Sequence, residues 1–258
     1  DQSCLNRWVT EADWDVQELN QQRLDWLQEE PSTRYSAHGV IAIDNTLVDH
    51  VGKRIDDVGF FWDHAEQRHK IAHDYLFANY VCSSGKHYSL EFRRFKKRDQ
   101  CEETGEVFES HTQHTIQLID WVCERDIPGT FTWDSYFSNA EVMNHTHAKR
   151  DRYDRPRGYV GDLKTNRKFE WKGKIQRVDE LAANIDPADK KELRRGDKRQ
   201  WYFTFTCHIL KVNHKVRIVI IWDQRRDTGP KKVLVTNQVR WEVVRILKVY
   251  RYRWTGTE

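Results

Sequence analysis

The stretch GVIAIDNT, Gly39–Thr46, decides the fold. It is a run of small and β-branched apolar residues that ends on a carboxylate, Asp44. A continuous apolar run bounded by turn residues is typical of a central strand buried on both faces, and a carboxylate there is costly unless a partner neutralises it. The pattern predicts a strand over residues 39–44 with Asp44 at its end, and a metal ion is the simplest partner for that aspartate.

A second segment of this kind, GTFTWD, ends on Asp134, 90 residues further along the chain. A third carboxylate, Glu258, follows Asp134 by 124 residues and closes a helix expected over residues 239–258. Glu258 stands about three turns beyond Leu247 on that helix, which aims its carboxylate towards the sheet. Two strand-end aspartates and one helical glutamate therefore form the candidate site.

The residues alone leave two interpretations of this set open. Magnesium and manganese prefer oxygen ligands, and two such ions about 4 Å apart can activate an attacking oxygen and stabilise a leaving one. Alternatively, Asp44 and Asp134 cap turns after their strands, because Asp followed by Asn or Ser is common turn chemistry.

Composition bounds the class of protein. At 258 residues the chain can bury a full core, as one large domain or two small ones. Its mean hydropathy is −0.88, and it has no apolar run long enough to span a membrane. Its five cysteines are widely spaced and contain no CxxC, which favours reduced thiols in a cytosolic compartment and argues against a zinc site. The chain ends at Glu258 in mid-pattern, as expected of a fragment.

Charge is distributed unevenly along the chain. Residues 1–148 hold 14 Lys and Arg against 26 Asp and Glu, whereas residues 149–258 hold 29 against 14. The downstream half suits a polyanion such as nucleic acid, although a solvated basic surface gives the same composition.

Periodicity, capping and turn signals predict the other elements. We expect helices over residues 5–30, 110–125 and 138–150, hairpins formed by 75–82 with 87–95 and by 201–212 with 216–222, and a strand over 233–236. The expected capping pairs are Thr10 with Asp13, Ser110 with Gln113, and Ser138 with Glu141. Residues 45–70 are expected to be a long connection with weak strand content and 101–109 an acidic loop, and 149–199 has poor periodicity.

Several histidines are weaker candidates for metal ligands. His69 and His73, with Glu66 one turn before them, have a spacing that binds zinc on a helix. The local pattern is not helical, so solvated histidines are the expectation. His111 and His114 are expected at the surface of their helix.

Four segments together resemble the catalytic domain of bacterial insertion-sequence transposases of the DDE type. They are IAIDNT around Asp44, FTWDSYFSN around Asp134, VLVTNQ before the last helix, and YRYRWTGTE ending at Glu258. The resemblance covers nearly the whole chain in order. It implies an α/β, ribonuclease H-like fold, in which a mixed sheet is flanked by helices and a β-rich insertion precedes the last helix.

The resemblance also implies a domain organisation. Residues 1–35 would be a helical N-terminal connector, 36–156 and 231–258 the ribonuclease H-like core, and 157–230 the insertion.

The implied activity is metal-dependent DNA strand cleavage and strand transfer at insertion-sequence ends, as in cut-and-paste transposition. Asp44, Asp134 and Glu258 would be the catalytic triad and would bind two Mg²⁺ or Mn²⁺ ions. The implied partners are double-stranded DNA, as transposon ends and target, and a second copy in a synaptic complex, with no membrane. The implied location is the bacterial or archaeal cytoplasm, at the nucleoid. A catalytically inactive DNA-binding fragment or domesticated module is the alternative.

The family signature also contains a tyrosine and an arginine that contact DNA, and Tyr250 and Arg253 match them. Four residues, rather than the family's three, separate Arg253 from Glu258. The basic stretch adds further expected DNA contacts at Arg152, Arg155, Arg157, Lys172 and Lys174.

Two other groups of residues have weaker signals. Asp49, Asp56 and Asp57 follow the first strand and are expected to be loop acids. Trp171 and Trp201 lie in the expected insertion, where related transposases use an aromatic side chain to hold an unstacked base, but core packing is the default for both.

Overall fold

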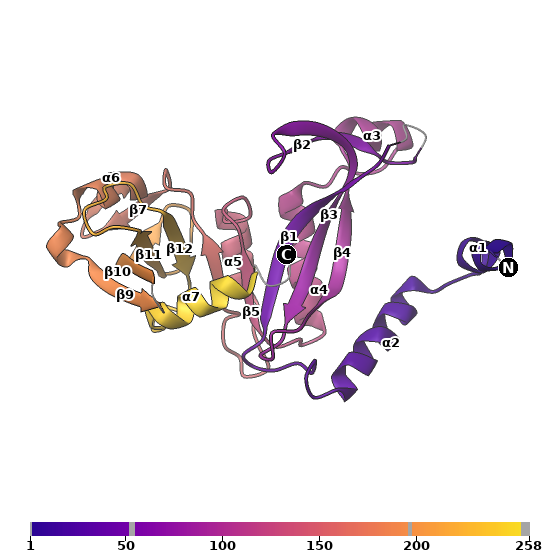
Figure 1. The fold of residues 1–258 in the computed structure, drawn as a ribbon, viewed down its shortest axis with the longest axis horizontal. Helices are drawn as coiled ribbons and strands as arrows, with labels where there is room; N and C mark the ends of the chain where they lie inside the picture. Colours follow the sequence, from indigo (N-terminus) through magenta and orange to yellow (C-terminus); the bar gives the residue numbers. More distant parts are fainter. Residues whose placement is uncertain (1, 52–54, 196–197, 254–258) are drawn as a thin grey trace.

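The computed structural model describes residues 2–51, 55–195 and 198–253, which form a mixture of helices and strands (Figure 1). The α-helices are α1 (Gln2–Glu11), α2 (Val16–Glu29), α3 (Arg98–Thr104), α4 (His111–Glu124), α5 (Ala140–Ala148), α6 (Val178–Asn184) and α7 (Val243–Tyr252). The strands are β1 (Val40–Asp49), β2 (Gly59–Asp63), β3 (Arg68–Val81), β4 (His87–Phe95), β5 (Thr130–Trp133), β6 (Tyr159–Asp162), β7 (Lys168–Trp171), β8 (Lys174–Arg177), β9 (Lys191–Arg195), β10 (Lys198–Ile209), β11 (Val216–Trp222) and β12 (Lys232–Thr236). A short 3₁₀ helix, Pro187–Asp189, precedes β9.

The strand predicted from GVIAIDNT, β1, is an interior strand of a mixed sheet. Its partners are β3, which is antiparallel to it, and β5, which is parallel. On one side β3 also pairs with β2 and β4; on the other, β5 pairs in parallel with β6, and β6 pairs antiparallel with β12. The prediction of an α/β fold with a mixed sheet is confirmed at this level.

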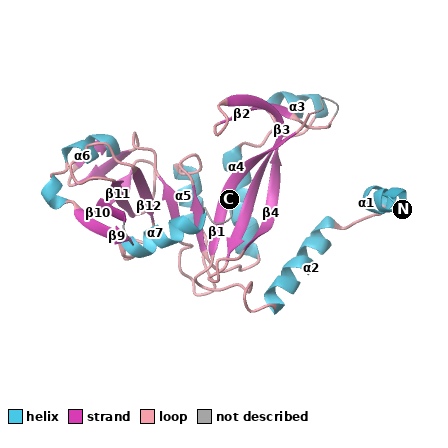
Figure 2. Cartoon of the chain, viewed as in Figure 1, coloured by secondary structure: helices cyan, strands magenta, loops and turns pink. Residues whose placement is uncertain are grey.

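The strand ladder continues from β12 through β11 and β10 to β7 and β8, with β9 on the edge of β10. Figure 2 shows these strands gathered in one half of the molecule, whereas the long β3–β4 pair stands in the other. β6 falls in the range expected for the insertion, yet it pairs with β5 of the expected core. The domain boundaries stay a prediction.

Helices cover both faces of the central strands. On one face α4 and α5 pack against Phe131 and Trp133, whose side chains alternate with the threonines of β5. On the other face α7 lies over β1, β5 and β6, and its Val243 and Ile246 pack with Val160. In Figure 1, α7 runs from the β-rich half towards β5.

The N-terminal prediction was only partly right. The chain forms two helices rather than one, because Asp15 caps a new helix by accepting the N–H groups of Gln17 and Glu18. Of the expected apolar face, Leu24 is buried, whereas Trp26 is 68% exposed. Figure 1 shows α1 and α2 extending to one side of the sheet.

The expected strand was too short, and one connection was misassigned. β1 continues past Asp44 to Asp49 because β3 pairs with it along its whole length. Residues 45–70 are therefore largely strand: the end of β1, then β2 and the start of β3. The acidic segment 101–109, expected as a loop, overlaps α3.

Helix capping was predicted correctly at one place and wrongly at two. Thr10 and Asp13 form no capping pair, because Thr10 lies inside α1 and Asp15 caps α2. Ser110 and Gln113 form the expected capping box of α4. The N-cap of α5 is Asn139 rather than Ser138, whose hydroxyl instead accepts the indole N–H of Trp133 at 2.9 Å. Both predicted hairpins are present, as β3–β4 and β10–β11.

None of the helices within the described ranges has both the length and the apolar composition needed to cross a bilayer.

Candidate active site

Asp44 stands where the buried part of β1 ends. The strand is fully buried from Val40 to Ile43, Asp44 is half-buried, and Asn45 and Thr46 are exposed. Asp44 therefore ends the apolar run, as predicted, although the strand itself continues. Its position is set by burial rather than by a turn.

Asp134 directly follows β5, the strand that lies beside β1. β1 and β5 pair in parallel, with Val40 opposite Thr130 and Ala42 opposite Thr132. Continuing the same register by two residues sets Asp134 beside Asp44. Neighbouring strands are about 4.8 Å apart, and side chains at matching positions point to the same face of the sheet. The structure thus brings together two residues that are far apart in the chain.

The environment of Asp44 confirms this proximity. Burial raises the pKa of the Asp44 carboxyl, and the negative charge of Asp134 raises it further. Arg253 opposes both effects: its Nη1 donates to Asp44 Oδ2 at 2.5 Å, and the two side chains are only 5% and 19% exposed. A cation therefore already lies against the first candidate ligand.

Asp134 also fulfils the turn-capping interpretation. Its Oδ1 accepts the backbone N–H of Tyr136 at 2.8 Å and that of Phe137 at 3.4 Å. Asp44 accepts the backbone N–H of Asn45 at 3.1 Å in addition to the Arg253 guanidinium, and it begins no turn. Capping explains Asp134 in part and leaves Asp44 unexplained.

Helix α7 presents its signature residues inward. Tyr250 and Arg253 are each 4% exposed. The Tyr250 hydroxyl lies 3.4 Å from Asp162 Oδ2 and 3.3 Å from Lys232 Nζ. Their expected role as DNA contacts stays a prediction, and Glu258 lies outside the described residues.

Asp162 is a neighbour of the site that sequence reasoning missed. β5 and β6 pair with Phe131 opposite Tyr159 and Trp133 opposite Gly161, so the next step sets Asp162 level with Asp134. The missed signal was the segment YVGD, a short apolar run that again ends on an aspartate.

A hydrogen-bond network lies on the α4 side of the sheet, behind the two aspartates. The carboxylate of Asp74 is 3% exposed and accepts the Asn45 side-chain amide at 3.2 Å. Its other oxygen lies 2.8 Å from His111 Nε2, and His111 Nδ1 lies 3.3 Å from the Tyr136 hydroxyl. Because Asn45 adjoins Asp44 and Tyr136 follows Asp134 by two residues, the network ties both site strands together.

The other histidine predictions were partly right. His69 and His73 are on strand β3, in agreement with their non-helical pattern, and His69 is exposed as expected, whereas His73 is 8% exposed, with its ring hydrogen-bonded to His50 at 2.9 Å. His114, expected at the surface, is 6% exposed because it faces the core beneath Phe95.

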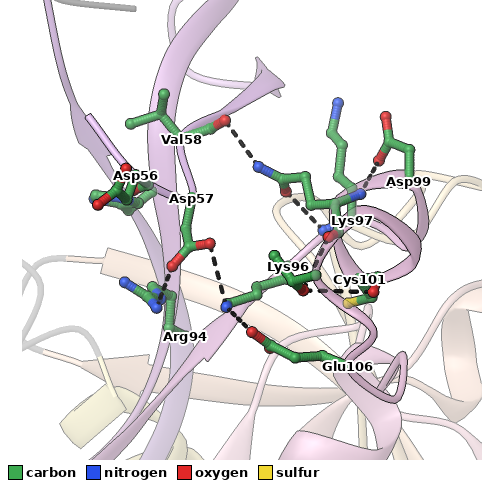
Figure 3. Close-up of polar contacts among 12 residues, drawn as sticks. Asp56, Asp57, Val58, Arg94, Lys96, Lys97, Asp99, Cys101 and Glu106 are labelled. Carbon is green, nitrogen blue, oxygen red and sulfur yellow. Dashed lines mark hydrogen bonds and ion pairs between the residues drawn. The ribbon is translucent and has the colours of Figure 1, made fainter. Parts of the chain in front are cut away.

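The acids that follow the first strand have structural partners. Asp57, a left-handed residue with φ of 62°, pairs with Arg94 and, at 3.2 Å, with Lys96 (Figure 3). Asp49 accepts Lys70 at 2.9 Å. Asp57 lies in a turn, as expected of a loop acid, whereas Asp49 is the last residue of strand β1 and not a loop residue.

The expected DNA-contacting cations differ in exposure. Arg152, Arg155 and Lys172 are at the surface, and Arg155 pairs with Asp151 at 2.7 Å. Arg157 is 3% exposed and donates to the Ile127 carbonyl at 2.7 Å, which gives it a structural role in this conformation.

The remaining residues expected in the insertion are partly buried or at the surface. Lys174 begins β8 and is exposed. Trp171 packs against the ring of Phe205 at 4.9 Å, and Trp201 is half-buried on β10 opposite Trp222. Packing thus accounts for Trp171.

The described part of the chain holds no group of three His, Cys, Asp or Glu side chains arranged to bind a metal ion. The pair Asp44 and Asp134 nevertheless fits a hard divalent cation, because two carboxylates on one face supply oxygen ligands and the Arg253 guanidinium shows that a positive charge is accommodated beside them.

Neither a family model nor a curated protein matches this sequence.

Proposed function

We propose that this chain is the catalytic domain of a DDE-type transposase, which cleaves DNA strands at the ends of an insertion sequence and joins them to a target with the help of divalent metal. The observation that carries the proposal is the register of two parallel strands, which sets Asp44 and Asp134 level on one face beneath α7.

The arrangement of the sheet supports a ribonuclease H-like core. An antiparallel meander, β1–β3–β4, leads through α4 into β5, and β5 leads through α5 into the parallel strand β6. The last helix returns to cover the face that bears the aspartates. The element order follows that of the family the sequence resembles.

The residues of the chain have separable roles in this proposal. Asp44 and Asp134 would hold the metal, with Glu258 as the third ligand, and bound divalent ions would activate the attacking oxygen and stabilise the leaving one. Arg253 neutralises Asp44 in this structure. The network of Asp74, His111 and Tyr136 fixes the backbone on which both aspartates stand.

The test is manganese-dependent cleavage of DNA that carries the ends of the parent element. Asp44→Asn and Asp134→Asn should each abolish cleavage and leave DNA binding intact, because an amide keeps the shape and loses the charge that a hard cation requires. Asp49→Asn, on the same strand, is the matched control and should cleave normally. Calorimetric titration with manganese reports the metal site independently of cleavage.

Glu258 is tested separately, since its assignment depends on the resemblance and on helical spacing. Glu258→Gln in a protein extended beyond this residue should remove cleavage. Normal cleavage by that variant means that another acid completes the site, and Asp162, level with Asp134, is then the first candidate.

A DNA-binding module without catalytic activity is the second candidate function. The Arg253–Asp44 ion pair favours it, because the Arg253 guanidinium takes the place beside Asp44 that a metal ion would need. DNA binding without manganese binding in the extended protein would select it over the enzyme.

A further inference from the structure

A groove of about 420 Å³ lies between α7 and the hairpin formed by β9 and β10. Its apolar floor includes Ile221, Val244 and Leu247. Its cationic lining consists of Arg194, Lys231, Lys232, Lys248 and Arg251. We call this feature the α7 groove.

No acidic side chain lines the α7 groove within the described part of the chain. Three of its five cations pair with acids outside it: Arg194 with Glu192, Lys231 with Asp223 and Lys232 with Asp162. Lys248 and Arg251, three residues apart on the exposed side of α7, have no ion-pair partner among the described residues. Their charges repel each other, so a bound anion would relieve that repulsion.

The apolar floor of the groove indicates which kind of anionic ligand it would bind. A duplex presents phosphates outside and hides the faces of its bases, so it gains little from an apolar surface, whereas an unpaired strand exposes both phosphates and base faces. Val244 is 63% exposed on the floor although its neighbour Ile246 is buried, so this apolar surface is open to a ligand. We propose that the α7 groove binds an unpaired segment of a DNA strand.

The groove adjoins the candidate active site. Tyr250, which lines it, has its hydroxyl 3.4 Å from Asp162, and Asp162 is level with Asp134. An unpaired strand in the groove would therefore end beside the carboxylates. The choice of DNA as the nucleic acid rests on the proposed function. The expectation of an unpaired strand rests only on the residues that line the groove.

The experiment measures affinity for a fluorescent oligothymidine and for a duplex of the same length, in EDTA, by anisotropy. Lys248→Glu combined with Arg251→Glu should weaken oligothymidine binding by about tenfold or more, and the slope of log affinity against log salt should fall by about 0.7 for each phosphate that the variant no longer neutralises. Val244→Asp, at an exposed position, should weaken oligothymidine binding and spare the duplex. Arg240→Glu, an exposed arginine before α7 that does not line the groove, is the control for a change of charge.

The outcomes separate the groove from the enzyme. Wild-type oligothymidine affinity in both groove variants, an equal loss in the Arg240→Glu control, or displacement of oligothymidine by polyglutamate at equal charge concentration overturns the groove proposal, whatever the cleavage assay gives. Loss of oligothymidine affinity in the groove variants alone supports the groove proposal, whatever the effect of Asp44→Asn on cleavage. Normal cleavage by Asp44→Asn overturns only the proposed enzyme. A wild-type protein that binds neither probe overturns both proposals. Matching thermal unfolding curves show that the variants are folded.

Discussion

At the scale of single residues, the contact between Arg253 and Asp44 is a largely buried ion pair within the candidate site. Both side chains are largely buried, and each neutralises the other. Breaking such a pair from one side leaves an uncompensated charge, which costs about 3 kcal/mol or more. Removing Arg253 alone therefore leaves the largely buried Asp44 carboxylate without its cationic partner.

A double-mutant cycle tests this interpretation. Arg253→Ala should lower the free energy of unfolding by about 3 kcal/mol, and adding Asp44→Asn should restore part of that loss because the stranded carboxylate is removed. Urea unfolding in EDTA measures both, with exposed Arg251→Ala as the control. Strictly additive losses would show that the two side chains do not interact.

His214 gives a second prediction at this scale, one of pH dependence. Its ring is 8% exposed, lies 2.9 Å from the Tyr159 hydroxyl and stacks on His147, and burial lowers its pKa from 6.5 to about 4. The unfolded chain binds this proton more readily, so the contribution to stability is complete above about pH 6.5 and is lost as the pH falls towards 4. The loss should be about 3 kcal/mol in wild type.

His214→Gln, which does not titrate, should flatten the dependence of unfolding free energy on pH over that interval. Exposed His87→Gln is the control and should keep the wild-type slope. An unchanged slope in His214→Gln would assign the acid sensitivity to other groups.

At the scale of elements, sequence patterns predicted what local signals determine. The apolar run before Asp44, the Ser110 capping box and the β3–β4 hairpin are all set by neighbouring residues, and they appear as expected. The strand length of β1 and the buried position of His114 depend on pairing and packing with distant segments, so local patterns missed them.

The candidate site shows the same division. The sequence shows that Asp44 and Asp134 are 90 residues apart. Only the fold shows that β1 and β5 pair in a register that offsets opposite residues by the same 90 positions. Asp162 was missed because its strand is only four residues long and its apolar run is too short to be recognised alone.

Helix α2 supplies a prediction at this scale. Its helical spacing marks Leu24 and Trp26 alike as apolar, but Leu24 is 3% exposed and Trp26 is 68% exposed. Leu24→Ala should lower the free energy of unfolding by about 2–4 kcal/mol, whereas Trp26→Ala should change it by less than about 0.5 kcal/mol. Chemical denaturation of both variants checks the orientation of the helix, and a larger loss for Trp26→Ala would mean that the other face packs.

At the scale of the whole molecule, the excess of acidic residues and the excess of basic residues lie in different halves of the chain. The downstream residues 149–258 hold the excess of cations, and they supply both the β7–β8 hairpin and α7. The upstream residues supply Asp44 and Asp134. Under the proposed function, a polyanion held by the basic half would lie near these carboxylates, and a bound cation would offset their repulsion of phosphate.

This division predicts where salt dependence originates. Lys172 and Lys174 stand at the exposed turn between β7 and β8, and replacing both with alanine should weaken duplex binding and reduce the slope of log affinity against log salt by about 0.9 for each phosphate that they neutralise in wild type. Lys86→Ala with Arg125→Ala, at exposed positions in the acidic half, makes the same change in net charge and should leave the slope near the wild-type value. Because net charge changes equally in the two double variants, a difference between them isolates direct phosphate contact from the overall field of the protein. Equal reductions in slope would mean that the duplex senses only total charge, and the β7–β8 turn would then have no place in the DNA-binding surface.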